Sequence, residues 1–223
     1  MNYQFEFEAV FDAWPELAHG ALNTVVLSAM AMTIGLVVAV SGALAQSSGP
    51  RLLRFLVKAY IELIRNTPFP IQLFMVYFGL PTLGFRIGSN SAALLSLVVN
   101  VGAYGIEIVR AGIESVPKRQ IESGMTLGFK PLQIFRYIVL KPAIKAIYPA
   151  LTSQFILLML YSSVCSTIAA TELTAAAGDI QARTFRSFEV YFVVTLMYLA
   201  MSMMFWAVFV AIDRRVISRW SLR

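Results

Sequence analysis

The sequence contains only one cysteine, Cys165, and one histidine, His19, among its 223 residues. A single cysteine has no partner for a disulfide within the chain, and the two residues are too few for a Cys/His zinc cluster. Charged residues are also scarce, at 13%, where a soluble domain has roughly 25%. Hydrophobic residues make up 58% and the mean hydropathy is +0.72, which excludes a disordered chain. What remains is an integral membrane protein.

Long apolar runs indicate an all-α membrane protein with five transmembrane helices. A helix needs about 20 apolar residues to cross a bilayer. Such runs predict spans at about residues 22–45, 66–85, 87–106, 146–171 and 190–212, within a transmembrane domain of residues 20–215. The alternation of apolar and polar residues that is typical of membrane barrels is missing from these runs. Residues 216–223 are expected to form a short tail.

The first 19 residues mix aromatic and acidic side chains. They lack the basic start and apolar centre of a cleavable signal peptide. This mixture favours an amphipathic segment at the outer membrane–water boundary. A disordered tail is the alternative interpretation.

Lys and Arg residues gather in three segments between or after the predicted spans, and only Arg86, Arg183 and Arg186 lie elsewhere. The three segments hold Arg51, Arg54, Lys58 and Arg65; Arg110, Lys118, Arg119, Lys130, Arg136, Lys141 and Lys145; and Arg214, Arg215, Arg219 and Arg223. Short cytoplasmic loops are rich in Lys and Arg, so we expect the N-terminus outside and the C-terminus in the cytoplasm. This topology explains the net charge of +6 without a nucleic-acid partner.

Residues 107–145 form the longest predicted loop, and their pattern indicates two short helices. Ser115–Pro117 has the residues of a helix start, with Ser115 as the cap. Gly128 is a helix stop, and Lys130-Pro131 begins an amphipathic helix with Leu132, Phe135, Ile138 and Val139 on one face. A compact element of this kind on the cytoplasmic side is interpreted as a docking element. A helix pair lying against lipid headgroups is the alternative.

Four segments in order along the chain resemble one known family. They are Glu62–Pro68, Tyr104–Pro117, Ile121–Gly128 with Ile138–Leu140, and Arg183–Glu189. Ile121–Gly128 resembles the Glu-Ala-Ala…Gly loop of ABC importer permeases, and the other segments resemble their polar amino-acid branch, the histidine, glutamine and arginine type. The resemblance implies a type I ABC importer permease fold with a cytoplasmic coupling helix, in the inner membrane of a bacterium.

In that family the short loop helix inserts into a cleft on a separate ATPase subunit. The resemblance therefore implies that the contact is made by Glu122, Ser123, Gly124, Thr126, Leu127, Gly128 and Phe129. It also implies a homodimer of ATPase subunits that holds ATP and Mg, a second permease subunit, and a periplasmic amino-acid-binding protein. Many relatives carry polar groups at the substrate where this chain has the uncharged segment Leu158–Tyr161. That difference favours a heterodimer over a homodimer; a substrate with an uncharged side chain is the alternative.

The chain has no energy source of its own. It contains no Gly-x-x-x-x-Gly-Lys-Ser/Thr phosphate loop, and its single histidine excludes a hydrolytic triad within the spans. The predicted spans also lack the row of carboxylates that marks ion-coupled carriers. The chain is therefore expected to be a permease subunit of an ATP-driven amino-acid uptake system, not an enzyme. A stand-alone channel or an ion-coupled secondary carrier is the alternative.

Carboxamides within the spans are the candidates for the substrate path. Gln72, Asn100 and Gln154 lie roughly 10–14 Å from the cytoplasmic flank of three different spans. Amides offer both donors and acceptors to a zwitterion without a buried charge. Tyr161 and Ser162 are further hydrogen-bonding candidates. The alternative is that each amide only joins two helices by a hydrogen bond.

Overall fold

A computed structural model of the chain describes residues 5–217, and every regular element within them is helical. The helices are α1 (Glu8–Asp12), α2 (Trp14–Ser48), α3 (Arg51–Arg65), α4 (Phe69–Thr82), α5 (Ser89–Glu114), α6 (Lys118–Thr126), α7 (Pro131–Ile134), α8 (Leu140–Tyr161), α9 (Leu173–Thr184) and α10 (Ser187–Ile212). A π-helical turn, Phe135–Val139, joins α7 to α8, a 3-10 helix, Ser162–Ile168, follows α8, and a second π-helical turn, Asp213–Ile217, follows α10. Part of the predicted N-terminal segment (residues 1–4) and most of the predicted tail (residues 218–223) lie outside the described residues.

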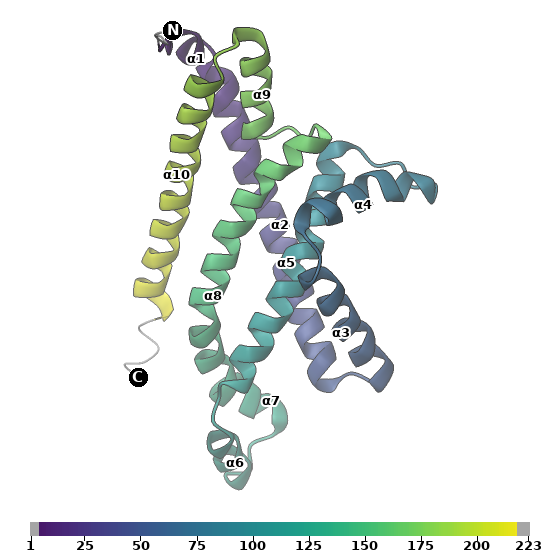
Figure 1. Cartoon of the computed structure of the whole chain (residues 1–223). Coiled ribbons are helices and arrows are strands. Elements are labelled where there is room, and N and C mark those ends of the chain that lie inside the picture. Colours follow the sequence, from purple (N-terminus) through teal and green to yellow (C-terminus); the bar gives the residue numbers. More distant parts are fainter. Residues whose placement is uncertain (1–4, 218–223) are drawn as a thin grey trace.

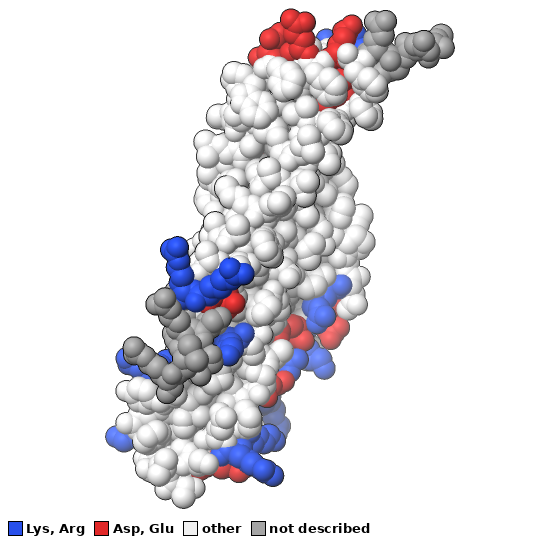
Figure 2. All heavy atoms as spheres, turned by 90° about the vertical axis from the view of Figure 1, so that its left-hand side faces the viewer, with Lys and Arg blue, Asp and Glu red and all other residues white. Residues whose placement is uncertain are grey.

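The long helices run between two ends of an elongated molecule (Figure 1). Helices α1 and α9 lie at one end, and α6 and α7 at the other. Helices α3 and α4 project on one side of the central helices, and α10 lies on the other. Figure 2 shows an uncharged middle on its visible face, with acidic side chains at the α1 end and most Lys and Arg side chains toward the α6 end. This charge pattern follows the segments that carry Lys and Arg in the sequence.

Within the described residues, four helical stretches are long and apolar enough to cross a membrane: Trp14–Ser48, Ser89–Glu114, Pro131–Ile168 and Ser187–Arg215. They contain most of four predicted spans. The remaining predicted span, residues 66–85, becomes the 14-residue helix α4, about 21 Å long against a hydrocarbon core of about 30 Å. Pro68 precedes α4 and Pro70 lies in its first turn, so α4 cannot continue α3 as one regular helix. The preceding basic segment, expected to be part of a connection, is the helix α3.

The predicted loop 107–145 is shorter than expected, because helices enter it from both sides. Helix α5 continues to Glu114, and Ser115 donates its hydroxyl to the Gly112 carbonyl at 2.7 Å instead of capping α6. On the other side, α7 and the π-helical turn run into α8 without a break. The π-helical turn precedes Pro142, which has no N–H to donate to the carbonyl four residues earlier. The expected apolar face also changes: Ile134 and Val139 are buried, whereas Leu132 is 76% exposed.

Helices α2 and α5 cross closely through small residues. A Cβ atom on Gly35 would lie 2.2 Å from Val101, and one on Gly105 would lie 2.6 Å from the Cβ of Ala39. Small residues let helix backbones approach closely where apolar burial alone cannot drive helix association in lipid. The crossing therefore fixes the two central helices against each other.

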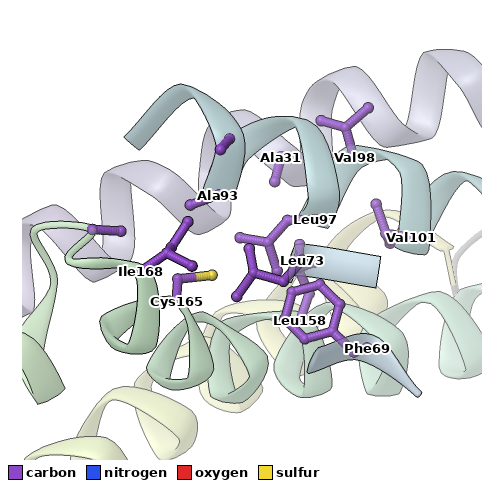
Figure 3. Packing of buried hydrophobic residues seen from close by; sticks show 12 residues of the cluster. Ala31, Phe69, Leu73, Ala93, Leu97, Val98, Val101, Leu158, Cys165 and Ile168 are labelled. Carbon is purple, nitrogen blue, oxygen red and sulfur yellow. The ribbon is translucent and has the colours of Figure 1, made fainter. Parts of the chain in front are cut away.

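A cluster of buried apolar side chains joins this helix pair to its neighbours (Figure 3). Leu73 of α4, Leu97 of α5 and Leu158 of α8 are fully buried and point toward one another. Cys165 and Ile168, from the 3-10 helix, close the cluster at one side. The cluster holds α4 in place although α4 is too short to cross a membrane.

The described part of the N-terminal segment packs against the start of α10. Phe5 contacts the ring of Phe188 with a centroid distance of 5.4 Å, and Phe7 contacts Phe192 at 6.2 Å. Glu6 forms an ion pair with Arg186. These contacts hold residues 5–7 against the protein.

Replacing Gly105 by alanine tests the α2–α5 crossing. The new methyl group would overlap the Cβ of Ala39, so we expect the free energy of unfolding to fall by about 1–3 kcal/mol. Thermal unfolding of the purified protein in detergent measures this change. The matched control is Gly178→Ala in α9, where a Cβ meets nothing within 4 Å. Equal melting temperatures for the two variants would contradict the close crossing.

Candidate functional site

Helix α6 is a short exposed helix whose end has a defined geometry. Gly128 has φ +78°, and its N–H donates to the Met125 carbonyl at 2.9 Å. The Phe129 N–H donates to the Gly124 carbonyl at 3.0 Å. This pair of hydrogen bonds is a Schellman motif, in which the left-handed residue is usually glycine. Gly128 therefore ends α6, as the sequence predicts.

The residues expected to contact an ATPase divide into two groups. Glu122, Ser123, Thr126, Leu127, Gly128 and Phe129 are exposed, and Leu127 is 74% exposed. Gly124 is buried instead, and a Cβ on it would lie 2.5 Å from Cδ1 of Ile138. Gly124 therefore faces its own chain and lets α6 approach the π-helical turn, while the other six residues form the exposed surface.

Helix α6 is seated by apolar contacts on α7 and the π-helical turn, which leads into α8. Val116, Ile134, Val139 and Ala143 are buried together, and Ile121 of α6 packs against them. Such a seat restricts motion of α6 relative to the long helices.

Two of the three predicted carboxamides are in contact. The Asn100 side-chain NH2 donates to Oε1 of Gln72 at 2.9 Å, and both residues are buried. The Gln72 NH2 group donates to the carbonyl oxygens of Ile64 at 2.7 Å and Thr67 at 2.9 Å. The Asn100 Oδ1 atom is buried and has no hydrogen-bond partner among the described residues. The pair therefore spans the break between α3 and α4 and retains one free acceptor.

The other three candidates are arranged differently. Gln154 is 9% exposed and makes no side-chain hydrogen bond to another described residue. Tyr161 stacks on Phe69 with a centroid distance of 5.5 Å, beside the cluster of Figure 3. Ser162 is fully buried and donates to the Met159 carbonyl at 2.7 Å, so its hydroxyl is used within its own helix.

A network of charged residues between α3 and the end of α5 was not predicted as part of the site. Nη1 of Arg65 lies 3.4 Å from Oε2 of Glu107. The guanidinium of Arg110 forms ion pairs with Oε2 of Glu107 at 3.1 Å and with Oε2 of Glu114 at 2.7 Å. The spacings of three and four residues predict the pairs within α5. The contact between Arg65 and Glu107 joins two helices, and helical spacing does not reveal it.

A buried carboxylate at the α9 end of the molecule was also not predicted from the sequence. Glu172 caps α9 by accepting the N–H groups of Thr174 at 2.8 Å and Ala175 at 2.6 Å, and it accepts the Tyr198 hydroxyl at 2.7 Å. Burial raises the pKa of the Glu172 carboxyl, and these hydrogen bonds oppose the rise. The signal in the sequence was an acidic residue directly before a helical segment. Glu172 fixes α9 to α10.

The model of the family described as binding-protein-dependent transport system inner membrane component matches residues 31–218. The chain belongs to this family. As a permease component of an ABC importer, it is a multi-pass protein of the inner membrane that works with ATPase subunits.

Individual relatives agree with this assignment. The chain is 31% identical over 215 residues to the glutamine transport system permease protein GlnP of Escherichia coli (strain K12), covering 96% of this chain and 98% of that protein. It is 35% identical over 170 residues to the L-cystine transport system permease protein TcyB of Bacillus subtilis (strain 168), covering 76% and 73%. A chain in a crystal structure of an amino acid ABC transporter with histidines superimposes with a TM-score of 0.90 at 33% identity, covering 96% of this chain and 100% of that one.

Replacing Gly128 by alanine tests the end of α6 in this permease. Open space surrounds the position, so only the left-handed backbone opposes a side chain, at about 1–2 kcal/mol. We expect faster hydrogen–deuterium exchange in residues 118–129 and little change in the long helices. Asparagine tolerates this backbone better, so Gly128→Asn should exchange more slowly than Gly128→Ala. Identical exchange in both variants and the wild type would contradict the assigned role of Gly128.

Proposed function

We propose that this permease is the transmembrane subunit of an ATP-driven amino-acid uptake system and forms half of its translocation pathway. The observation that carries the proposal is the exposed helix α6, seated at the end where Lys and Arg gather. The names of relatives that transport glutamine and L-cystine support an amino acid as substrate. ATP and Mg bind to the partner ATPase, and this chain converts their effect into movement.

The part that inserts into the ATPase is the exposed surface at the end of α6 and in the turn after it, formed by Glu122, Ser123 and residues 126–129. Its exposed leucine and phenylalanine provide apolar area, and Glu122 provides a charge. Gly124 contributes from behind, because it lets α6 rest on α7 and the π-helical turn. When the ATPase subunits close and reopen, α6 moves with them, and its apolar seat carries the movement into α5 and α8.

Gln72, Asn100 and Gln154 line the substrate path in this proposal, with Tyr161 beside them. The free Oδ1 atom of Asn100 and the unpaired amide of Gln154 suit a zwitterion, which needs both acceptors and donors. Ser162 is a weaker member of the path, since its hydroxyl is occupied within its own helix.

The remaining partners follow from the same proposal. The α6 end faces the cytoplasm, which places the N-terminus outside and the C-terminus inside. A second, different permease completes the pathway as a heterodimer, and it supplies substrate contacts that the uncharged segment Leu158–Tyr161 lacks. A periplasmic amino-acid-binding protein docks at the α9 end.

Replacing Leu127 by aspartate tests the docking surface. A carboxylate would enter an apolar contact and weaken the binding of the ATPase. We expect at least about tenfold less ATPase to co-purify, which corresponds to a loss of about 1.4 kcal/mol in binding free energy. ATP-driven uptake of L-glutamine in vesicles should fall with it. The wild-type permease should accumulate no solute unless the ATPase is present.

The matched control is Leu132→Asp, a leucine of similar exposure on α7, outside the proposed surface. Its complex should keep the ATPase. Full ATPase binding by the Leu127 variant would exclude the docking assignment. Solute flux by the permease alone would favour a stand-alone channel or an ion-coupled carrier.

Replacing Gln154 by alanine tests the substrate path. We expect uptake to slow by about fivefold, as the loss of one hydrogen bond worth about 1 kcal/mol would give, with complex yield unchanged. Initial uptake rates in vesicles measure the effect. The control is Thr195→Val in α10, whose hydroxyl donates only to the Tyr191 carbonyl of its own helix. Equal uptake by the two variants would reduce Gln154 to a packing residue.

A further inference from the structure

Arg65 ends α3 at the break before α4 and reaches across to α5. Its Nη1 atom lies 3.4 Å from Oε2 of Glu107, and its guanidinium lies 5.6 Å from the ring centroid of Tyr104. The preceding residue, Ile64, accepts a hydrogen bond from the side chain of Gln72. The end of α3 therefore carries two contacts at once, one to the carboxamide pair and one to the charged end of α5.

A cavity of about 450 Å³ lies between the end of α2, α3 and the end of α5. This volume is within the range of about 300–1,000 Å³ that is typical of small-molecule sites. Its charged lining contains equal numbers of basic and acidic residues, namely Arg54, Lys58, Arg110, Glu62, Glu107 and Glu114. Because Glu107 lines the cavity, the Arg65–Glu107 ion pair stands at its edge. Asn100, which contacts Gln72, lies seven residues before Glu107 on α5, about 10 Å along the helix.

We propose that the Arg65–Glu107 ion pair is a gate between the carboxamide pair and this cavity, through which a zwitterionic solute leaves the protein. The inference rests on the proposed transport of amino acids. It assigns a route and a gating pair to the half of the path that faces the α6 end.

The chemistry of a zwitterion fits such a gate. Separating the pair leaves Arg65 without its carboxylate, while Glu107 keeps Arg110 as its remaining partner. An ionic partner supplied by the solute then favours the open state. An amino acid brings a carboxylate for Arg65 and an ammonium group for Glu107, so it compensates both charges while it passes. The mixed lining of the cavity continues this compensation beyond the gate. The side chains of Arg65 and Glu107 are 45% and 28% exposed, so water already reaches the pair and can take over the solute's charges as it leaves.

The gate is also placed to respond to α6. Arg110 holds Glu107 from the other side and binds Glu114, the last residue of α5. Helix α6 begins at Lys118 and shares its apolar seat with the end of α5. A shift of α6 therefore changes the position of Glu107 relative to α3.

The test uses the permease complex with its ATPase in vesicles preloaded with radiolabelled L-glutamine, without ATP. Arg65→Ala should release the solute about fivefold faster than the wild type, the change expected from an ion pair worth about 1 kcal/mol. The charge-exchanged double variant Arg65→Glu/Glu107→Arg should restore retention. If the alanine variant assembles poorly, Glu107→Gln, which keeps the size of the side chain, carries the same expectation.

The matched control is Arg86→Ala, which removes an exposed arginine between α4 and α5, outside the gate and the proposed docking surfaces. Its vesicles should retain the solute. Three results would each overturn the gate. They are release at the wild-type rate by assembled Arg65→Ala, release by the control as fast as by Arg65→Ala, and fast release by the double variant. An absence of ATP-driven uptake by the wild type would overturn the proposed function and the gate together. If the wild type shows normal ATP-driven uptake and any of those three results is found, the gate is overturned and the proposed function stands.

Discussion

The side chain of Gln72 stabilises a helix break inside an apolar bundle, and the polar interior is arranged around it. Its NH2 group bonds the carbonyls of Ile64 and Thr67, and its Oε1 atom accepts from Asn100. A buried polar group without a partner costs about 1–3 kcal/mol, and a lipid environment offers no water in exchange. The break can therefore exist at this depth because side chains satisfy its carbonyls: Gln72 bonds those of Ile64 and Thr67, and Asn66 and Thr67 bond those of Glu62 and Leu63. Its position in turn places Arg65 opposite α5.

The central helices behave as one body because their contacts are close and directional. Side chains of the facing helix lie against Gly35 and Gly105. A Cβ atom at either position would overlap the facing side chain. The same is true of Gly112 between α5 and α8, where a Cβ would lie 2.0 Å from Ile147. Closely packed interfaces pass on displacement with little deformation. In the proposed mechanism, a movement of α6 would reach Asn100 through α5 as a shift of the whole helix.

The sequence predicts the long helices well, because the length of an apolar run directly measures the ability to cross a membrane. The structure differs from the predicted spans where an apolar run contains prolines that interrupt the helix. Residues 66–85 are apolar enough for a span, yet Pro68 and Pro70 end regular helix geometry at their start. The sequence predicts a connection where α3 lies, because its basic residues are typical of a cytoplasmic loop. Its exposed apolar face, with Leu52 and Phe55 at 70% and 67%, shows that both signals belong to one helix.

The site was predictable to the extent that local chemistry determines it. A glycine after a short helix predicts the left-handed end at Gly128, and the equal depths of Gln72 and Asn100 allow their contact. Gly124 is buried because α7 and the π-helical turn pack against it. The local sequence pattern does not predict where these two elements lie. The Arg65–Glu107 contact likewise depends on the angle at the break between α3 and α4.

The distribution of polar groups along the path has a physical reason of its own. Neutral amides occupy the deep part, where a fixed charge would be expensive in a low dielectric and would also hold a zwitterion too tightly to release it. Full charges occur at the α6 end, where Arg65 and Glu107 are partly exposed and water screens them. In the proposed path, a solute moving in that direction exchanges hydrogen bonds with amides for ion pairs with charges where water begins to compete for both. Release along this path would require no single large step in free energy, so the proposal leaves the ATPase only the movement of helices.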